Sequence, residues 1–129
     1  MRSRIEIVKA YPTSISESEK GILIFQDVKY ALTSSLSFSG RIVFFQTDSY
    51  NSRVYEFEND LTGVMTNPAL YGDGMRWYIV AHYNTSFGLS LSMKYSELIK
   101  PNEKTLGSGE TLINSNVDNR LSFQLDFKF

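Results

Sequence analysis

Cysteine is absent from this chain of 129 residues. Disulfides and thiolate metal sites are therefore excluded, and cysteine usage indicates nothing about the redox compartment. The chain also lacks an excess of charge, because 13 basic and 14 acidic residues give a net charge of -1. This balance gives no electrostatic reason to expect nucleic acid as a partner, and we predict none. We also predict no cofactor and no metal.

Long apolar runs are missing as well. A transmembrane helix needs about 20 consecutive apolar residues, and no such run occurs. Helical periodicity is also absent over the eleven or so residues needed to recognise it. The length suits a single domain over residues 1–129. We therefore predict an all-β domain.

The amino terminus lacks the pattern of a secretory signal. Met1, Arg2, Ser3 and Arg4 lead directly into strand-like sequence, without an apolar core or a small-residue cleavage site. An outer-membrane protein needs such a signal. If the chain is one, we expect it to be a mature piece or a fragment of a longer protein.

Aromatic residues are plentiful. Eight tyrosines, nine phenylalanines and one tryptophan make up 14% of the chain, a share that suits sheets and membrane interfaces. Several of them fall at predicted strand ends, where they suit either an interface belt or ordinary cross-strand packing. The set that includes these strand-end residues is Tyr11, Tyr50, Tyr55, Tyr71, Trp77, Tyr78, Tyr83 and Tyr95.

The last ten residues, RLSFQLDFKF, alternate without a break between apolar and polar positions. An extended strand therefore carries the apolar set on one face. That set is Leu121, Phe123, Leu125, Phe127 and Phe129. The segment resembles the closing strand of bacterial outer-membrane β-barrels. In that family the terminal aromatic strand is the signal that the assembly machinery recognises.

Six more segments read as strands, which gives an antiparallel up-and-down meander of about seven to eight long strands. The turns at residues 33–35 and 84–86 are short enough to form hairpins. Strands of roughly nine to twelve residues exceed the globular mode of about five or six and suit a tilted membrane-spanning strand. The six segments are residues 4–11, 21–32, 36–47, 53–59, 75–83 and 87–96.

On a membrane interpretation the apolar face contacts lipid and the polar face lines the lumen of a barrel. The side chains that we expect to face the lumen are Arg41, Arg76, His82, Lys94 and Asp126. A soluble antiparallel sheet shows the same alternation, so a lipocalin-like barrel that binds a small apolar ligand is the alternative.

Several longer segments extend the resemblance. GILIFQDVKY, SFSGRIVFFQTDSYNSRVYEFENDL, PALYGDGMRWYIVAHY and TLGSGETLINSN followed by RLSFQLDFKF are similar to the carboxyl-terminal portion of a large bacterial outer-membrane β-barrel family. Some members of that family carry amino-terminal helix-hairpin-helix repeats. The resemblance implies a place in the bacterial outer membrane, with lipid and the barrel-assembly machinery as partners, and a structural rather than enzymatic role. Further strands or chains would complete the barrel.

The order of the strands before Gly74 is left open by the sequence. In one arrangement residues 53–59 form a wall strand and the turn at 33–35 lies outside. In the other, residues 33–35 form a periplasmic turn. Residues 48–74 then make an external excursion, or a short strand is added near 61–69.

Few residues indicate chemistry. His82 is the single histidine, and as a catalyst it would need a serine or acidic partner beside it. Asp48, Asp60 and Asp73 lie in or beside loops, where they suit turn chemistry better than calcium binding. Gly107 to Gly109 lacks the following lysine and helix of a phosphate loop and is expected to be a flexible turn.

Overall fold

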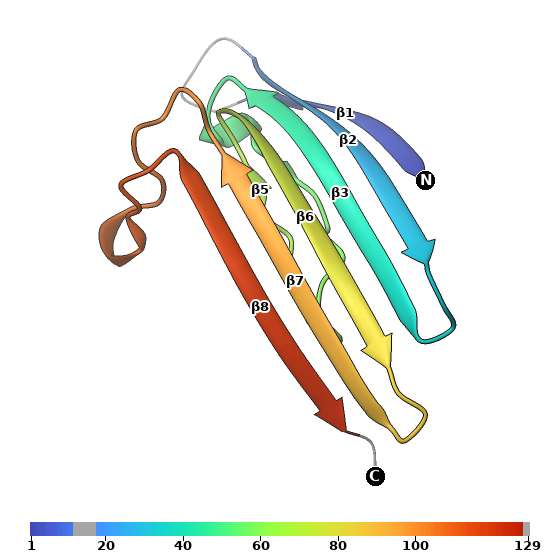
Figure 1. Ribbon diagram of the computed structural model, residues 1–129. Coiled ribbons are helices and arrows are strands. Elements are labelled where there is room, and N and C mark those ends of the chain that lie inside the picture. Colours follow the sequence, from blue (N-terminus) through green and yellow to red (C-terminus); the bar gives the residue numbers. More distant parts are fainter. Residues whose placement is uncertain (12–17, 128–129) are drawn as a thin grey trace.

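The computed structural model describes residues 1–11 and 18–127, whose regular structure consists of β-strands and two short 3-10 helices (Figure 1). Six long strands form one antiparallel sheet in the order β1-β2-β3-β6-β7-β8. The predicted all-β antiparallel meander is thereby confirmed. The strands are β1 (Arg2–Ala10), β2 (Glu19–Ala31), β3 (Leu36–Thr47), β6 (Asp73–Asn84), β7 (Leu89–Ile99) and β8 (Val117–Phe127).

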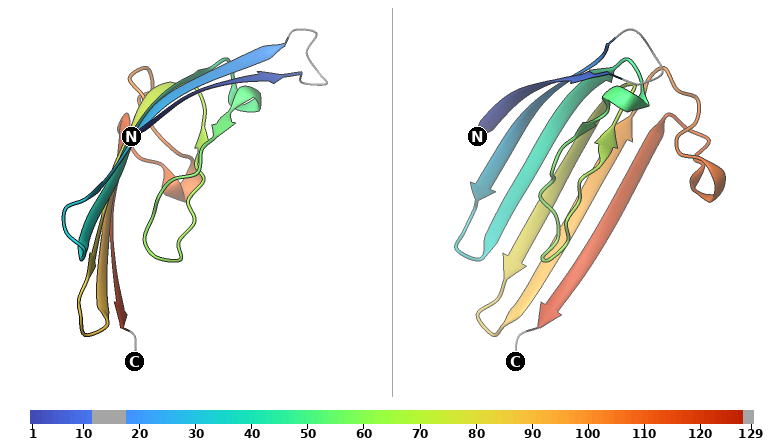
Figure 2. Two further views of the ribbon diagram at one scale, coloured as in Figure 1. Left: turned by 90° about the vertical axis from the view of Figure 1, so that its right-hand side faces the viewer. Right: turned by 180° about the vertical axis from the view of Figure 1, so that it is seen from behind.

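The segment between β3 and β6 leaves the sheet. It begins with the short helix η1 (Tyr50–Ser52), followed by β4 (Val54–Tyr55), which pairs with β5 (Ala69–Leu70) in a separate two-stranded ribbon. The prediction of a long wall strand at residues 53–59 is therefore wrong. We call residues 48–72 the inner segment, because they lie on the concave side of the bent sheet (Figure 2).

The connections differ at the two ends of the strands. Short turns join β2 to β3 and β6 to β7 at one end, where the Asn84 amide also donates to the Ser35 carbonyl oxygen at 2.8 Å. The inner segment and the connection from β7 to β8, which contains η2 (Gly109–Thr111), lie at the other end. Of the two strand orders left open by the sequence, this is the one with an excursion after β3.

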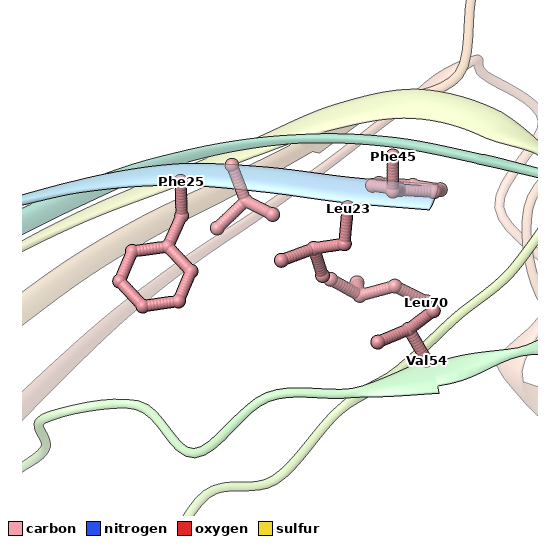
Figure 3. Packing of buried hydrophobic residues seen from close by; sticks show 6 residues of the cluster. Leu23, Phe25, Phe45, Val54 and Leu70 are labelled. Carbon is pink, nitrogen blue, oxygen red and sulfur yellow. The ribbon is translucent and has the colours of Figure 1, made fainter. Parts of the chain in front are cut away.

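The two faces of the sheet have different surroundings. Alternate side chains of β2 and β3 contact the inner segment and form the apolar core (Figure 3). The core residues are Leu23, Phe25, Val43, Phe45, Val54 and Leu70. We call this the covered face. The opposite face, which we call the apolar face, carries large hydrophobic side chains that nothing in the described chain covers.

The sheet is open. Strands β1 and β8 each pair on one side only, so the described residues form a curved sheet and not a closed barrel. No helix within residues 1–11 and 18–127 is long and apolar enough to cross a membrane.

Candidate functional site: the charged layer under the inner segment

Three acidic side chains of the inner segment point toward the sheet. Glu56, Glu58 and Asp60 occupy alternate positions, and in an extended chain such positions share one side. Tyr55 and Phe57, which flank Glu56, point away from the sheet and are 47% and 51% exposed. The inner segment therefore presents its carboxylates to the covered face, and the rings of Tyr55 and Phe57 lie on its side away from the sheet.

Arg41 of β3 connects strand β2 to the inner segment. Its guanidinium donates to Asp27 Oδ2 of β2 at 2.9 Å and to Glu56 Oε1 of the inner segment at 2.7 Å. It also donates to the Phe57 carbonyl oxygen at 2.9 Å. The guanidinium lies over the ring of Phe25, 4.0 Å from its centroid. Such bidentate and stacked geometry is specific to arginine.

Glu58 is the centre of the second cluster. Its Oε2 accepts from Arg76 Nη2 of β6 and from Lys94 Nζ of β7, both at 3.0 Å, while Arg76 Nε donates to Oε1. Lys94 also donates to Asp60 Oδ2 at 2.6 Å. The charges are buried, since the side chains of Glu58 and Lys94 are 2% and 6% exposed. Three consecutive carboxylates thus bind cations on three neighbouring strands.

The pKa of Asp60 reflects this environment. Burial alone would raise the pKa of its carboxyl group, but hydrogen bonds from Lys94, Thr66 and the Leu61 amide outweigh burial and hold the pKa below its usual value. The charged form therefore stabilises the folded state above the pKa of an unfolded aspartate. That contribution is lost as the pH falls through the lowered folded value.

An apolar contact and one glycine complete the docking of the inner segment. Val54 and Leu70 pack on Leu23 and its neighbours in the core. Gly21 of β2 lies directly beneath η1, and a Cβ atom there would be 2.3 Å from the Ser52 carbonyl oxygen. The backbones approach closely because β2 has no side chain at this point.

The five residues expected to face a lumen all lie on the covered face. Their cross-strand pairs fix this, for example Arg41 with Tyr78 and His82 with Ser37. Arg41, Arg76 and Lys94 belong to the charged layer. Asp126 is outside it and accepts from Gln124 Nε2 at 2.9 Å.

His82 has a serine beside it. Its Nδ1 is 2.9 Å from Ser92 Oγ, the distance of a hydrogen-bonded serine–histidine pair. Ser92 is only 1% exposed, however, and no acidic side chain within the described residues hydrogen-bonds to His82. The serine thus lacks access for a substrate, and the imidazole lacks an acidic group to orient it.

The predicted loop aspartates have separate partners. Asp48 accepts from the Lys20 amide at 2.8 Å, and Asp73 accepts from Asn102 Nδ2 at 3.1 Å. Asp60 belongs to the charged layer. Nowhere in residues 1–11 and 18–127 do three or more possible metal ligands gather into one group.

The terminal strand presents its hydrophobic side chains on the apolar face. Phe123 and Leu125 are 65% and 66% exposed, and Leu121 and Phe127 are exposed beside them. Phe129, the last member of the predicted set, lies outside the described residues.

Two aromatic side chains mark the apolar face near its long-connection end. Trp77 and Tyr95 have ring centroids 5.3 Å apart. Both bind Glu97, with Trp77 Nε1 at 3.3 Å from Oε1 and the Tyr95 hydroxyl at 3.0 Å from Oε2. Their apolar bodies thus lie against the sheet while their polar atoms meet one carboxylate.

The charged layer is the part of the site that was not predicted from sequence. Of the two arrangements that the sequence leaves open, one puts Glu56 and Glu58 in a wall strand and the other puts them in an external excursion. Neither places them against the cations expected to face the lumen. The sequence signal for the charged layer was a row of alternating carboxylates, together with basic residues on the polar faces of the strands that had no predicted partner.

No family model, curated protein or solved structure matches this chain.

Proposed function

We propose that this chain forms part of the wall of a bacterial outer-membrane β-barrel. The apolar face contacts lipid, and the covered face looks into the lumen. The observation that supports this most is the placement of the two kinds of side chain. Phe44, Phe123 and Leu125 are exposed, while Arg41, Glu58 and Lys94 are buried.

The apolar face is continuous across strands. Ile24 lies opposite Phe44, Met93 opposite Phe123, and Leu91 opposite Leu125. All six are exposed. Soluble monomers rarely expose a contiguous apolar patch of more than a few hundred Å², and a lipid environment removes the cost of exposing it.

The lipocalin-like alternative fits this arrangement less well. A soluble barrel that binds an apolar ligand needs its hydrophobic side chains to converge on the interior. Here the concave side holds one small apolar core, which the inner segment already fills, and beside it lie ion pairs and serines such as Ser92 and Ser96. Alternation with apolar residues outside and polar residues inside is the pattern of a membrane barrel.

The partners follow from the same arrangement. Lipid covers the apolar face, and the barrel-assembly machinery recognises the terminal strand. Further strands, from this polypeptide or another chain, pair with the free edges of β1 and β8. The inner segment narrows the lumen, so the role is that of a wall or scaffold with a restricted pore. Neither catalysis nor nucleic acid binding forms part of the proposal.

The native tryptophan provides the test. Trp77 is the only tryptophan and lies on the apolar face. After reconstitution into vesicles whose acyl chains carry bromine, we expect strong quenching of its fluorescence relative to unbrominated lipid. A chain that stays monomeric in buffer without detergent, with Trp77 fluorescence unchanged by brominated vesicles, would refute the proposal.

A further inference from the structure

A groove runs between the inner segment and strands β2 and β3. Two cavities of about 520 and 540 Å³ share Lys29, Phe57 and Asn59 in their linings, so they adjoin along β2. The second of them reaches Ser37, Ser39 and His82 on the covered face. Its volume lies within the range of small-molecule sites.

Hydrogen-bond donors gather on the floor of this cavity. Lys29 lies opposite Ser39, and Ser37 lies opposite His82, so the four side chains occupy neighbouring positions of one face. Among the described residues, no carboxylate lies within ion-pair distance of the Lys29 ammonium group. When Ser92 donates to His82 Nδ1, the neutral ring carries its proton on Nε2 and becomes a further donor.

The carboxylates in the lining are already neutralised. Glu58 pairs with Arg76 and Lys94, and Asp60 pairs with Lys94. The three cations Arg76, Lys94 and Lys29 therefore outnumber the two carboxylates of Glu58 and Asp60. The local charge is therefore positive. Ala31 and Val64 add apolar side chains to the lining.

We infer that this groove binds a small organic anion, such as a carboxylate or a phosphate ester. Lys29 and the hydroxyls of Ser37 and Ser39 contact the oxyanion, and Val64 lies against the apolar part. An anionic acceptor makes stronger hydrogen bonds to these donors than a neutral one. The groove needs only the docked inner segment, so this inference stands apart from the proposed membrane location.

Calorimetric titration of the detergent-solubilised chain tests the site, with phenyl phosphate as the anionic probe and benzyl alcohol as the neutral one. We expect phenyl phosphate to bind at least about tenfold more tightly than benzyl alcohol. K29Q should weaken the binding of phenyl phosphate at least about tenfold, and S39A should weaken it by a smaller factor. The matched control K104Q changes an exposed lysine outside the groove and should leave the affinity unchanged.

Three results would overturn the inference. They are no detectable binding of phenyl phosphate, equal affinity for the two probes, and equal affinity of K29Q and K104Q. Lys29 is exposed, so its replacement removes no buried contact that the fold needs. Trp77 quenching after reconstitution into brominated vesicles reports the membrane location separately. Loss of binding with quenching intact therefore contradicts the anion site alone.

Discussion

Glu58 is the buried carboxylate on which the charged layer depends most. It accepts from Arg76 and Lys94, which come from different strands. Replacing a buried ion-paired group by a neutral one leaves its partners buried without compensation. In Glu58→Gln the amide NH₂ would also face one of the two cations. We expect this substitution to lower the free energy of unfolding by about 3–5 kcal/mol, measured by urea titration of the reconstituted protein.

Glu103→Gln is the matched control. Glu103 pairs with Lys100 at 3.3 Å, but its side chain is 44% exposed. Because water screens such a pair, the expected loss is below about 1 kcal/mol. Equal losses for Glu58→Gln and Glu103→Gln would show that the charged layer is not buried as described.

The strands and the inner segment differ in how far their sequence predicts them. The hairpins β2–β3 and β6–β7 follow from alternation and short turns, and the structure confirms both. Residues 53–59 alternate as well, but their carboxylates pair with Arg41, Arg76 and Lys94 on the sheet. Alternation shows which side chains share a side, and it does not show whether the backbone joins the sheet. For residues 53–59, the ion pairs to side chains of the sheet place the backbone over the sheet and not within it.

Docking of the inner segment depends on a close approach at Gly21. A Cβ atom there would meet the Ser52 carbonyl oxygen at 2.3 Å, so one backbone must move. Overpacking of this kind costs about 1–3 kcal/mol. In Gly21→Ala we therefore expect trypsin to cleave after Arg53 at least about fivefold faster than in the unmodified chain.

Gly40→Ala is the control for a glycine-to-alanine change within a strand. Gly40 lies opposite Ile79 on the apolar face, and its added Cβ would be 3.2 Å from the Tyr78 carbonyl oxygen, away from the inner segment. Cleavage after Arg53 should remain near the unmodified rate. If Gly21→Ala also left it unchanged, the close contact between η1 and β2 would be wrong.

The molecule as a whole combines an open, curved sheet with a buried charged layer on its concave side (Figure 2). Its sequence predicted which residues share each face, because side chains alternate strictly along a strand. It did not predict that one connection folds back over the polar face, since that depends on contacts between distant residues. Strands β1 and β8 each pair on one side only, so closing this sheet into a barrel would require further strands.

The apolar face is the feature on which the whole account depends, and spin labels along β8 measure its surroundings directly. The chain has no cysteine, so single cysteines can be introduced at each position from 121 to 125. In lipid vesicles, we expect labels at Leu121, Phe123 and Leu125 to be accessible to oxygen dissolved in the acyl chains. Labels at Ser122 and Gln124 should be shielded from lipid. Greater access of a water-soluble nickel reagent than of oxygen at Phe123 and Leu125 would contradict the account.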